Sequence, residues 1–447
     1  MTYLSTIASH LHRLEQAAAQ LDTAMWPSVL DVRTGRFPDG DHVPQRVYRL
    51  IGAPRGSTLY WDQPMIVAAY ALSALTASPQ CAQAADRYID EFLATCVAEN
   101  GLFLWGNHIY YDLFERRVVA FHQGHHELRP ITPAWECFWS RAPEQTAAYV
   151  RTMAHRHIYD SDTGGFNRHD DGTQGHAFLE AGGVLVESLT WLYSKTKAPD
   201  LLESALAVAR YSYRHRDPAT GLLPNEPDKG RWDSEVCTSE VGLWAQCLLQ
   251  AHAYTSNDEF LTMAHQATRA YLEHAYDAES GQFVGQVRLR DGREVVPDEP
   301  GYWPRRFADP WNTDQWPTHD YPMPLADACL SLHALTEDPI YPEAVRRWIR
   351  IVMDGRPERT GGWTYAENYG QCIHLLTRAG LAWEEDALLA DARRLADEAI
   401  ERLSEGDMIQ GYPGGHVYEA VDGVGYLFLA LMALETRGGL DMIGFRF

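Results

Sequence analysis

The stretch TQGHAFLEAGGVLVESLTWLYSKT, residues 173–196, decides how the rest of the chain is interpreted. Its second half is apolar almost all round, with Val184, Leu189 and Trp191 on different sides, which predicts a helix enclosed by other helices. His176 and Glu180 stand four residues apart, so a helix that already includes His176 places both on one face, near its N-terminal end. A loop rich in Gly, Asp and His precedes them. We therefore expect an inner helix whose start faces a polar site.

The same unit, a glycine-containing loop followed by an apolar helix, recurs along the chain. In each loop an apolar or aromatic residue follows closely after a glycine, which we expect to end the preceding helix or turn with a positive φ. These glycines are Gly35, Gly101, Gly165, Gly221, Gly281, Gly361 and Gly411.

Two kinds of helix are expected to alternate between these loops. Amphipathic helices with a charged face are predicted at 3–25, 81–98, 144–157, 200–214, 258–275, 342–353 and 384–405. More apolar helices are predicted at 62–77, 133–140, 176–196, 235–254, 320–336, 366–380 and 418–435. An outer ring of the first kind around an inner ring of the second describes an all-α fold, an (α/α) toroid of six to seven helical hairpins, with seven favoured. An open solenoid is the alternative.

The predicted toroid is a single catalytic domain, residues 1–447, with short β-hairpins in its loops. Strand patterns are confined to FLWGNHIYYDLF, residues 103–114, and to residues 283–296, which we expect to form a hairpin. The long segment 283–318 is expected to form a lid or a wall of the site.

Composition excludes several classes of protein. The 38 basic and 61 acidic residues give a net charge of −23, which disfavours nucleic acid and anionic membranes as partners. No apolar run is long enough to cross a membrane, and the N-terminus lacks a signal-peptide pattern. The 7 cysteines include no CxxC pair, which predicts free thiols in a cytoplasmic protein. Phosphate-binding glycine motifs are absent, so no cofactor is expected.

Aromatic, carboxylate, amide and imidazole side chains gather where the apolar helices begin. Trp and Tyr rings stack on pyranose faces while polar groups bind hydroxyls, so this composition predicts a carbohydrate site. For any single residue a structural role, such as a helix cap, is an alternative. The candidate substrate-binding residues are Trp61, Asp62, Trp105, Asn107, His126, Glu127, Arg129, Asn167, Arg168, His169, Glu180, Trp232, Glu235, His319, Tyr365 and Asn368.

We favour β-elimination on a uronate, which needs a base for the C5 proton, an acid for the leaving oxygen and positive charge for the carboxylate. Histidines are predicted as base or neutraliser and a tyrosine as the acid, with Tyr365 as a further choice. Asn107, Arg129 and Arg168 are expected to hold the carboxylate. The candidate catalytic residues are His108, His176, Tyr111 and Tyr369.

Other chemistries remain open at this point. A glycoside hydrolase would use two carboxylates, drawn from Asp62, Glu127, Glu180, Glu235 and Asp320. A sugar 2-epimerase or isomerase would use His176 with His319 or His416. A non-catalytic sugar-binding toroid is a fourth possibility. The run HQGHHE, residues 122–127, offers metal ligands, but its spacing fits neither HExxH nor a zinc finger, so no metal site is expected.

The pattern resembles the six-hairpin glycosidase-like superfamily of (α/α) toroid carbohydrate-active enzymes. QGHAFLEAG, residues 174–182, is similar to the GHxxEA motif of the N-acylglucosamine 2-epimerase and cellobiose epimerase group, which implies an acid/base role for His176. Asn107 and His108, followed by tyrosines, look like the Asn/His/Tyr sets of toroid alginate and glucuronan lyases, which implies a neutralising Asn107 and a basic His108.

We therefore predict a polysaccharide lyase that cleaves a uronate-containing oligo- or polysaccharide. It is expected to be a monomer or homodimer whose partner is its saccharide substrate. The central expectation is geometric, namely that the starts of the inner helices converge on one sugar-sized cavity.

Overall fold

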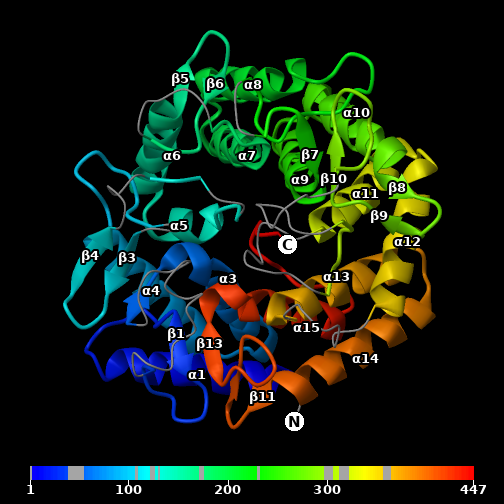
Figure 1. Cartoon of the computed structure of the whole chain (residues 1–447). Coiled ribbons are helices and arrows are strands. Elements are labelled where there is room, and N and C mark those ends of the chain that lie inside the picture. The colour runs from blue at the N-terminus through cyan, green and yellow to red at the C-terminus, as the bar shows by residue number, and fades with distance from the viewer. Residues whose placement is uncertain are drawn as a thin grey trace. The chain divides into compact units, whose positions relative to one another are not determined.

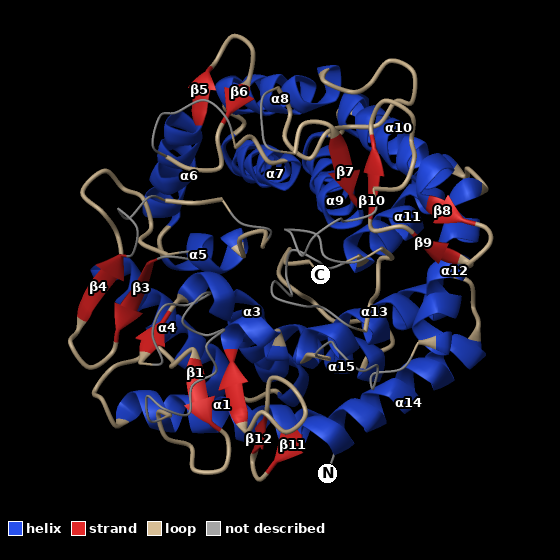
Figure 2. Cartoon of the chain, viewed as in Figure 1, coloured by secondary structure: helices blue, strands red, loops and turns tan. Residues whose placement is uncertain are grey.

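The computed structural model describes residues 3–38, 55–105, 109–120, 126–128, 131–170, 176–228, 232–295, 306–311, 322–355 and 364–446. The chain divides into two compact units. Unit 1 comprises Met1–His126, Pro133–Tyr149 and Pro357–Phe447, and unit 2 comprises Glu127–Thr132 and Val150–Arg356. Helices dominate both units and the strands between them are short (Figures 1 and 2).

Unit 1 is built on three inner helices, α3 (Leu59–Thr76), α13 (Ala366–Ala382) and α15 (Val424–Glu435). Helix α15 packs against both α13 and α3. Every residue of α15 except its last is buried, because its neighbours enclose it and its sequence carries no charge before Glu435.

The outer helices of unit 1 are amphipathic. Helix α4 packs on α3 and α14 packs on α13. The buried stripe of α4 consists of Ala, Leu, Ile and aromatic residues, and that of α14 of Ala and Leu. Helix α6 begins in unit 1 and ends in unit 2. The outer helices are α1 (Tyr3–Ala19), α4 (Gln80–Thr95), α6 (Pro143–His157) and α14 (Asp386–Leu403). The short helix α5 (Trp135–Arg141), which contacts α4, is a fourth inner helix.

Unit 2 repeats the scheme. The inner helices α7 (Leu179–Thr196), α9 (Thr238–Thr255) and α11 (Met323–Thr336) pack side by side in that order (Figure 1). Each carries an outer helix against it, which explains why only one stripe of the outer helix is apolar. These outer helices are α8 (Pro199–Arg214), α10 (Asp258–Ala275) and α12 (Ile340–Asp354).

The strands form small antiparallel pairs in the loops, as predicted. A three-stranded sheet in unit 1 joins β2, β3 and β4, and β1 pairs with β13. In unit 2, β7 pairs with β10 and places Glu235 opposite Arg288. The bounds are β1 (Val29–Asp31), β2 (Gly56–Ser57), β3 (Ile109–Asp112), β4 (Arg117–Ala120), β5 (Ile158–Asp160), β6 (Gly165–Phe166), β7 (Glu235–Cys237), β8 (Tyr276–Asp277), β9 (Gln282–Phe283), β10 (Gln286–Arg288), β11 (Ser404–Glu405), β12 (Met408–Ile409) and β13 (Val417–Glu419).

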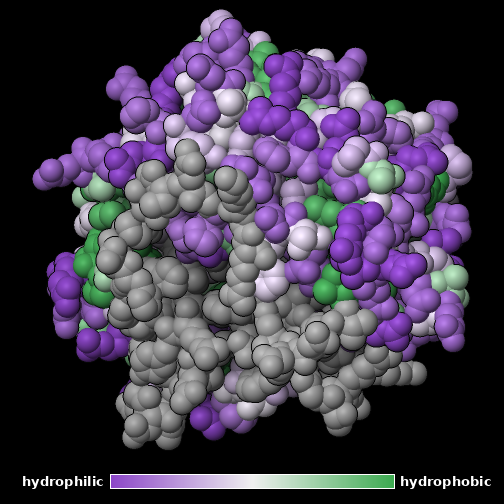
Figure 3. Space-filling view, turned by 45° about the horizontal axis from the view of Figure 1, so that its top comes forward, coloured by the Kyte–Doolittle hydropathy of each residue, from purple (hydrophilic) through white to green (hydrophobic). Residues whose placement is uncertain are grey.

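The alternation of outer and inner helices is confirmed: within the described residues, seven helices of each kind occur, close to the predicted ranges. The face in Figure 3 is mostly hydrophilic over its described atoms. Among large apolar side chains in the described part of the chain, Phe114 and Leu335 are the exposed ones. No helix in the described part combines the length and apolar character needed to span a bilayer.

One local prediction is confirmed in short form. The hairpin expected at 283–296 is present because Val287 bridges Glu294 and the Val295 N–H donates to the Gln286 carbonyl, while the other edge of β10 pairs with β7. Two other predictions are wrong. Helix α15 starts at Val424, since β13 and a 3-10 turn (Ala420–Asp422) occupy the predicted beginning of that helix. The positive φ predicted for two loop glycines is absent: in the third loop Gly164 rather than Gly165 has it, and Gly411 of the seventh loop does not. A Cβ on Gly164 would lie 2.1 Å from the Ala207 carbonyl oxygen.

The start of α7 is the most consequential correction. The helix begins at Leu179, so His176 precedes it and does not share a helix face with Glu180. The Leu179 N–H donates to the Asn225 carbonyl, and the His176 carbonyl accepts from the Arg168 N–H. These bonds tie the segment before α7 to neighbouring loops instead of extending the helix.

Candidate functional site

The predicted site residues fall into three groups. Those of unit 2 form one connected cluster, those of unit 1 occupy separate buried networks, and a third group lies outside the described residues. This third group is Asn107, His108, Arg129 and His319, together with Asp320 and residues 122–125 of HQGHHE. Their roles stay predictions.

The unit 2 cluster is organised by a short contact between two loops. The Leu128 N–H donates to the Arg168 carbonyl, and Glu127 and His169 form an isolated antiparallel bridge. The side chains then meet, with the Glu127 Oε1 atom 3.0 Å from Arg168 Nη2 and 3.3 Å from His169 Nε2. The Asn167 side chain fixes the loop by accepting from the His169 N–H at 2.9 Å.

Arg168 is fixed on several sides. Its guanidinium lies 4.2 Å from the ring centroid of Phe178, a cation–π distance, besides the contact with Glu127. Its Nη1 atom is buried and has no hydrogen-bond partner among the described residues. A buried donor of this kind is costly unless an acceptor binds it, and a planar guanidinium is suited to a carboxylate.

The ring of His169 has two neighbours that require different protonation states. Its Nε2 atom lies 3.4 Å from Arg168 Nε, where it accepts a hydrogen bond, and 3.3 Å from Glu127 Oε1, to which it donates when protonated. The carboxylate can therefore stabilise a proton that the imidazole takes up.

His176 faces the same cluster from the segment before α7. Its ring centroid is 5.7 Å from that of His169, and its side chain is 57% exposed. Its Nδ1 atom is 3.5 Å from Oε1 of Glu226, a carboxylate that is fully buried. Glu226 was not predicted from the sequence. It follows the loop glycine Gly221, as Arg168 follows Gly165, and this similar position in the loop could have pointed to it.

Two further glutamates of unit 2 lie close together at the starts of α7 and α9, namely Glu180 and Glu240. Glu240 Oε2 accepts from the Glu180 N–H at 2.9 Å, and both side chains are buried. Burial and the nearby charge of Glu180 raise the pKa of Glu240 well above its ordinary value, while Arg168 opposes the shift. The raised pKa favours the protonated form of Glu240 next to Glu180.

The same cluster contains residue types that could bind a metal ion. The carboxylate of Glu127 and the imidazole of His169 are ligand types that divalent transition metals accept. The described residues hold no group of three or more His, Cys, Asp or Glu side chains placed to bind one ion.

Trp232 and Glu235 complete the unit 2 cluster. The Trp232 N–H donates to Glu226 Oε2 at 2.8 Å, and the ring is half-buried. Glu235 lies on β7, where its carbonyl accepts from the Asn225 N–H. Burial raises the pKa of the Glu235 carboxyl above its ordinary value.

In unit 1, Asp62 joins four parts of the chain. It accepts from Ser28 Oγ at 2.9 Å and from the hydroxyls of Tyr88 at 2.8 Å and Tyr418 at 3.5 Å. Burial raises the pKa of its carboxyl to about 7 against these hydrogen bonds. Trp61 beside it is 2% exposed. Asp62 thus joins these segments, and its role in substrate binding stays a prediction.

Four other predicted residues of unit 1 hold structure together. The Trp105 indole N–H donates to the Tyr149 hydroxyl at 3.0 Å, and that hydroxyl lies 2.6 Å from His126 Nε2. Tyr365 and Asn368 form the capping box of α13, in which Asn368 Oδ1 accepts from the Tyr365 N–H.

The two tyrosines predicted as catalytic acids have partners on outer helices, and their catalytic role stays a prediction. The Tyr369 hydroxyl donates to Glu398 of outer helix α14 at 2.9 Å. Tyr111 lies on β3, and burial and the charge of Glu91 on outer helix α4 raise the pKa of its hydroxyl. A raised pKa makes a phenol a weaker proton donor.

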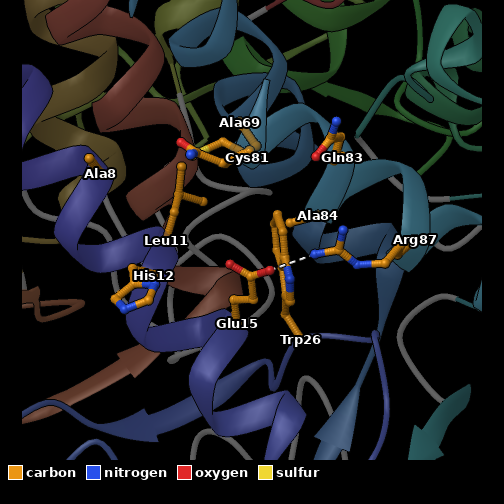
Figure 4. Close-up of a pocket in the computed structure, with 11 residues that line it drawn as sticks. Ala8, Leu11, His12, Glu15, Trp26, Ala69, Cys81, Gln83, Ala84 and Arg87 are labelled. Carbon is orange, nitrogen blue, oxygen red and sulfur yellow. Dashed lines mark hydrogen bonds and ion pairs between the residues drawn. The ribbon is translucent and has the colours of Figure 1, made fainter. Parts of the chain in front are cut away.

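A cavity of about 570 Å³ in unit 1 lies elsewhere (Figure 4). It opens between α1, α3 and α4, with the Glu15–Arg87 ion pair spanning it at 2.5 Å and Trp26 below. None of the predicted site residues lines it. It therefore does not bear on the predicted chemistry.

Comparison with known proteins places these residues in context. A family model described as periplasmic pectate lyase matches residues 57–222, which include Glu127, Arg168, His169 and His176. Among solved structures, cellobiose 2-epimerase from Bacillus thermoamylovorans is similar with a TM-score of 0.53, at 10% identity over 77% of this chain and 95% of that chain.

Two further structures are more distantly similar. A D-mannose isomerase gives a TM-score of 0.49 at 14% identity, covering 79% of this chain and 88% of its own. An α-1,6-mannanase from Salegentibacter gives 0.48 at 13% identity, covering 78% and 96%.

The chain has the (α/α) toroid fold. The likeness to the epimerase and the alternating outer and inner helices confirm this fold class and the resemblance to the toroid superfamily at the level of fold.

Proposed function

We propose that the chain is a carbohydrate-active enzyme, a polysaccharide lyase that cleaves a uronate-containing saccharide by β-elimination at the unit 2 cluster. Arg168 carries the proposal, because its fixed guanidinium has a buried Nη1 atom without a partner among the described residues. A guanidinium that binds a uronate carboxylate stabilises the negative charge that develops as the C5 proton leaves. The match to a family model described as periplasmic pectate lyase supports the same reaction.

The two histidines divide the proton transfers. His169 removes the C5 proton, and Glu127 Oε1, 3.3 Å from the His169 Nε2 atom, stabilises the resulting imidazolium. The electrons of the C–H bond form the C4–C5 double bond, the C4–O4 bond breaks, and protonated His176 gives its proton to O4. The 5.7 Å between the two ring centroids suits groups that act on adjacent atoms of one sugar. Proton exchange with water restores both rings.

This assignment replaces the predicted tyrosine acid with His176. It also changes the role of His169 from substrate binding to catalysis. The cluster also contains buried carboxylates, which would repel an anionic uronate. The positive charge of Arg168 offsets this repulsion, a task that does not arise with a neutral sugar. The raised pKa of Glu240 limits the combined negative charge of these carboxylates.

A glycoside hydrolase is the second candidate. Such an enzyme needs one protonated carboxyl as acid and one ionised carboxylate. The Glu180–Glu240 pair supplies both, because the pKa of Glu240 is raised next to Glu180. A sugar epimerase is the third. The cytoplasmic location predicted from the sequence stays a prediction, since the matched family is described as periplasmic.

One incubation with a panel of acidic and neutral oligosaccharides tests the proposal. We expect the ultraviolet absorbance of a 4,5-unsaturated uronate from an acidic substrate only. New reducing ends without this absorbance would identify a hydrolase, and an altered sugar without cleavage would identify an epimerase.

A further inference from the structure

Glu226 contacts two candidate site residues with its two carboxylate oxygens. Oε2 accepts the Trp232 N–H at 2.8 Å, and Oε1 lies 3.5 Å from His176 Nδ1. The Glu226 N–H also donates to the Trp232 carbonyl at 3.3 Å. One fully buried side chain therefore contacts both the proposed acid and the backbone of Trp232.

The backbone around Glu226 is fixed by its neighbour Asn225. The Asn225 N–H donates to the Glu235 carbonyl, its carbonyl accepts from the Leu179 N–H, and its side chain accepts from the Cys237 N–H at 2.7 Å. Asn225 thus joins the start of α7 to β7. Glu226 is positioned by these bonds before any saccharide binds, which is the condition for a preorganised site.

His176 approaches this carboxylate through an unusual backbone conformation. Its φ of 57° lies in the left-handed region, which costs a residue with a side chain free energy. The Arg168 N–H donates to its carbonyl and holds that conformation. Strain of this kind persists where the surrounding structure requires it, and here it accompanies the contact with Glu226.

We infer that Glu226 is a positioning residue, which orients the His176 imidazole through Oε1 and fixes the backbone that carries Trp232 through Oε2, for one and the same sugar residue of the substrate. This inference rests on the proposed function, because it assigns His176 as the acid. The contact through Nδ1 leaves Nε2 of His176 for transfer of the proton to O4. A 3.5 Å contact in the empty enzyme shortens to a hydrogen bond when the substrate is bound.

A purely structural Glu226 would behave differently from a positioning one. A structural carboxylate matters equally whether or not His176 is present. A positioning carboxylate matters only while there is an imidazole to orient, so the two substitutions are not additive. Glu226→Gln keeps one contact and removes the other. Its amide oxygen still accepts the Trp232 N–H, while its NH₂ group cannot accept from His176.

The experiment is a double-substitution cycle with Glu226→Gln, His176→Ala and the two combined, assayed by formation of unsaturated product. We expect Glu226→Gln to lower kcat about 10-fold with KM changed by less than about twofold, a fraction of the 10²–10⁴-fold effect of general acid catalysis. In the His176→Ala background the same change should alter kcat by less than about twofold. Glu203→Gln, an exposed glutamate of α8 in the same unit, is the matched control and should behave as the wild type.

An equal loss of kcat in both backgrounds would overturn the inference. Glu226→Ala also removes the second contact, the hydrogen bond from the Trp232 N–H. We expect this variant to raise KM for an oligouronate as well, because the backbone at Trp232 is no longer held. Thermal unfolding of each variant shows whether it is folded, and the isosteric Glu226→Gln remains decisive if Glu226→Ala unfolds.

A second readout does not depend on lyase activity. Nitrogen-15 NMR of the His176 ring reports which nitrogen carries the proton in the neutral form. We expect the Nδ1–H tautomer in the wild type and a shift towards Nε2–H in Glu226→Gln. If the wild type forms no unsaturated product but the tautomer shifts, the proposed function fails and the contact stands. An unchanged tautomer overturns the contact itself.

Discussion

Replacing Arg168 by lysine tests the neutralising role in the proposed reaction. Lysine keeps the positive charge beside Glu127 but loses the planar fork that contacts Glu127 at 3.0 Å, His169 at 3.4 Å and the Phe178 ring at 4.2 Å. Losing one donor that stabilises a developing oxyanion costs about 10²–10³-fold in kcat. We therefore expect kcat/KM of Arg168→Lys on an oligouronate to fall by about 10²-fold or more.

Stability must be separated from catalysis in this test. Arg168→Gln would leave Glu127 buried without its cation, at a cost of about 3–5 kcal/mol, so lysine is the cleaner substitution. Phe178→Leu is the matched control, because it removes the cation–π contact and leaves the charges in place. We expect it to lower the free energy of unfolding by about 1–2 kcal/mol with kcat/KM within about threefold of the wild type. A folded Arg168→Lys enzyme with near-normal kcat/KM would refute the role of Arg168.

Three further changes have defined outcomes. Glu127→Gln should lower kcat by about 10²-fold in the same assay, because the His169 imidazolium loses its carboxylate; a change below twofold would contradict this. Asp62 has a pKa raised to about 7 by burial, so its stabilising contribution is full below pH ~4 and is lost as the pH rises through ~7. The free energy of unfolding, measured in urea, should fall between pH 5 and pH 8, and this fall should be smaller by about 3 kcal/mol in Asp62→Asn than in the wild type. An equal fall in both proteins would show that Asp62 ionises freely. Tyr369→Phe should cost about 1 kcal/mol of stability through its bond to Glu398 and leave kcat/KM unchanged; a loss of turnover would return Tyr369 to the mechanism.

The sequence predicts the helices well because burial period and loop glycines are local properties. The positions of α9 and α10 follow from apolar and amphipathic periods, and the positive φ values at Gly101 and Gly221 follow from the loop pattern. Predictions failed where the chain is held by contacts distant in sequence. The Leu179–Asn225 hydrogen bond sets the start of α7, and no feature of residues 173–196 reveals it.

The candidate site was predicted in part for the same reason. Arg168 and His169 were identified by residue type, and their meeting with Glu127 required loops about forty residues apart to pair. Glu226 was missed because PNEP looks like an ordinary turn. The hydrogen bond from Tyr369 to Glu398 could not be predicted, because periodicity places a residue on a helix but does not show that α14 carries a carboxylate facing it.

Mass spectrometry of the products of a defined oligouronate tests the central claim most directly. Elimination uses no water, so one fragment of each cleaved bond should be lighter by one water than its hydrolytic counterpart and should carry the double bond. We predict this fragment for the wild type and its loss in Arg168→Lys. Fragments that have all gained water at the cleaved bond would contradict the elimination mechanism.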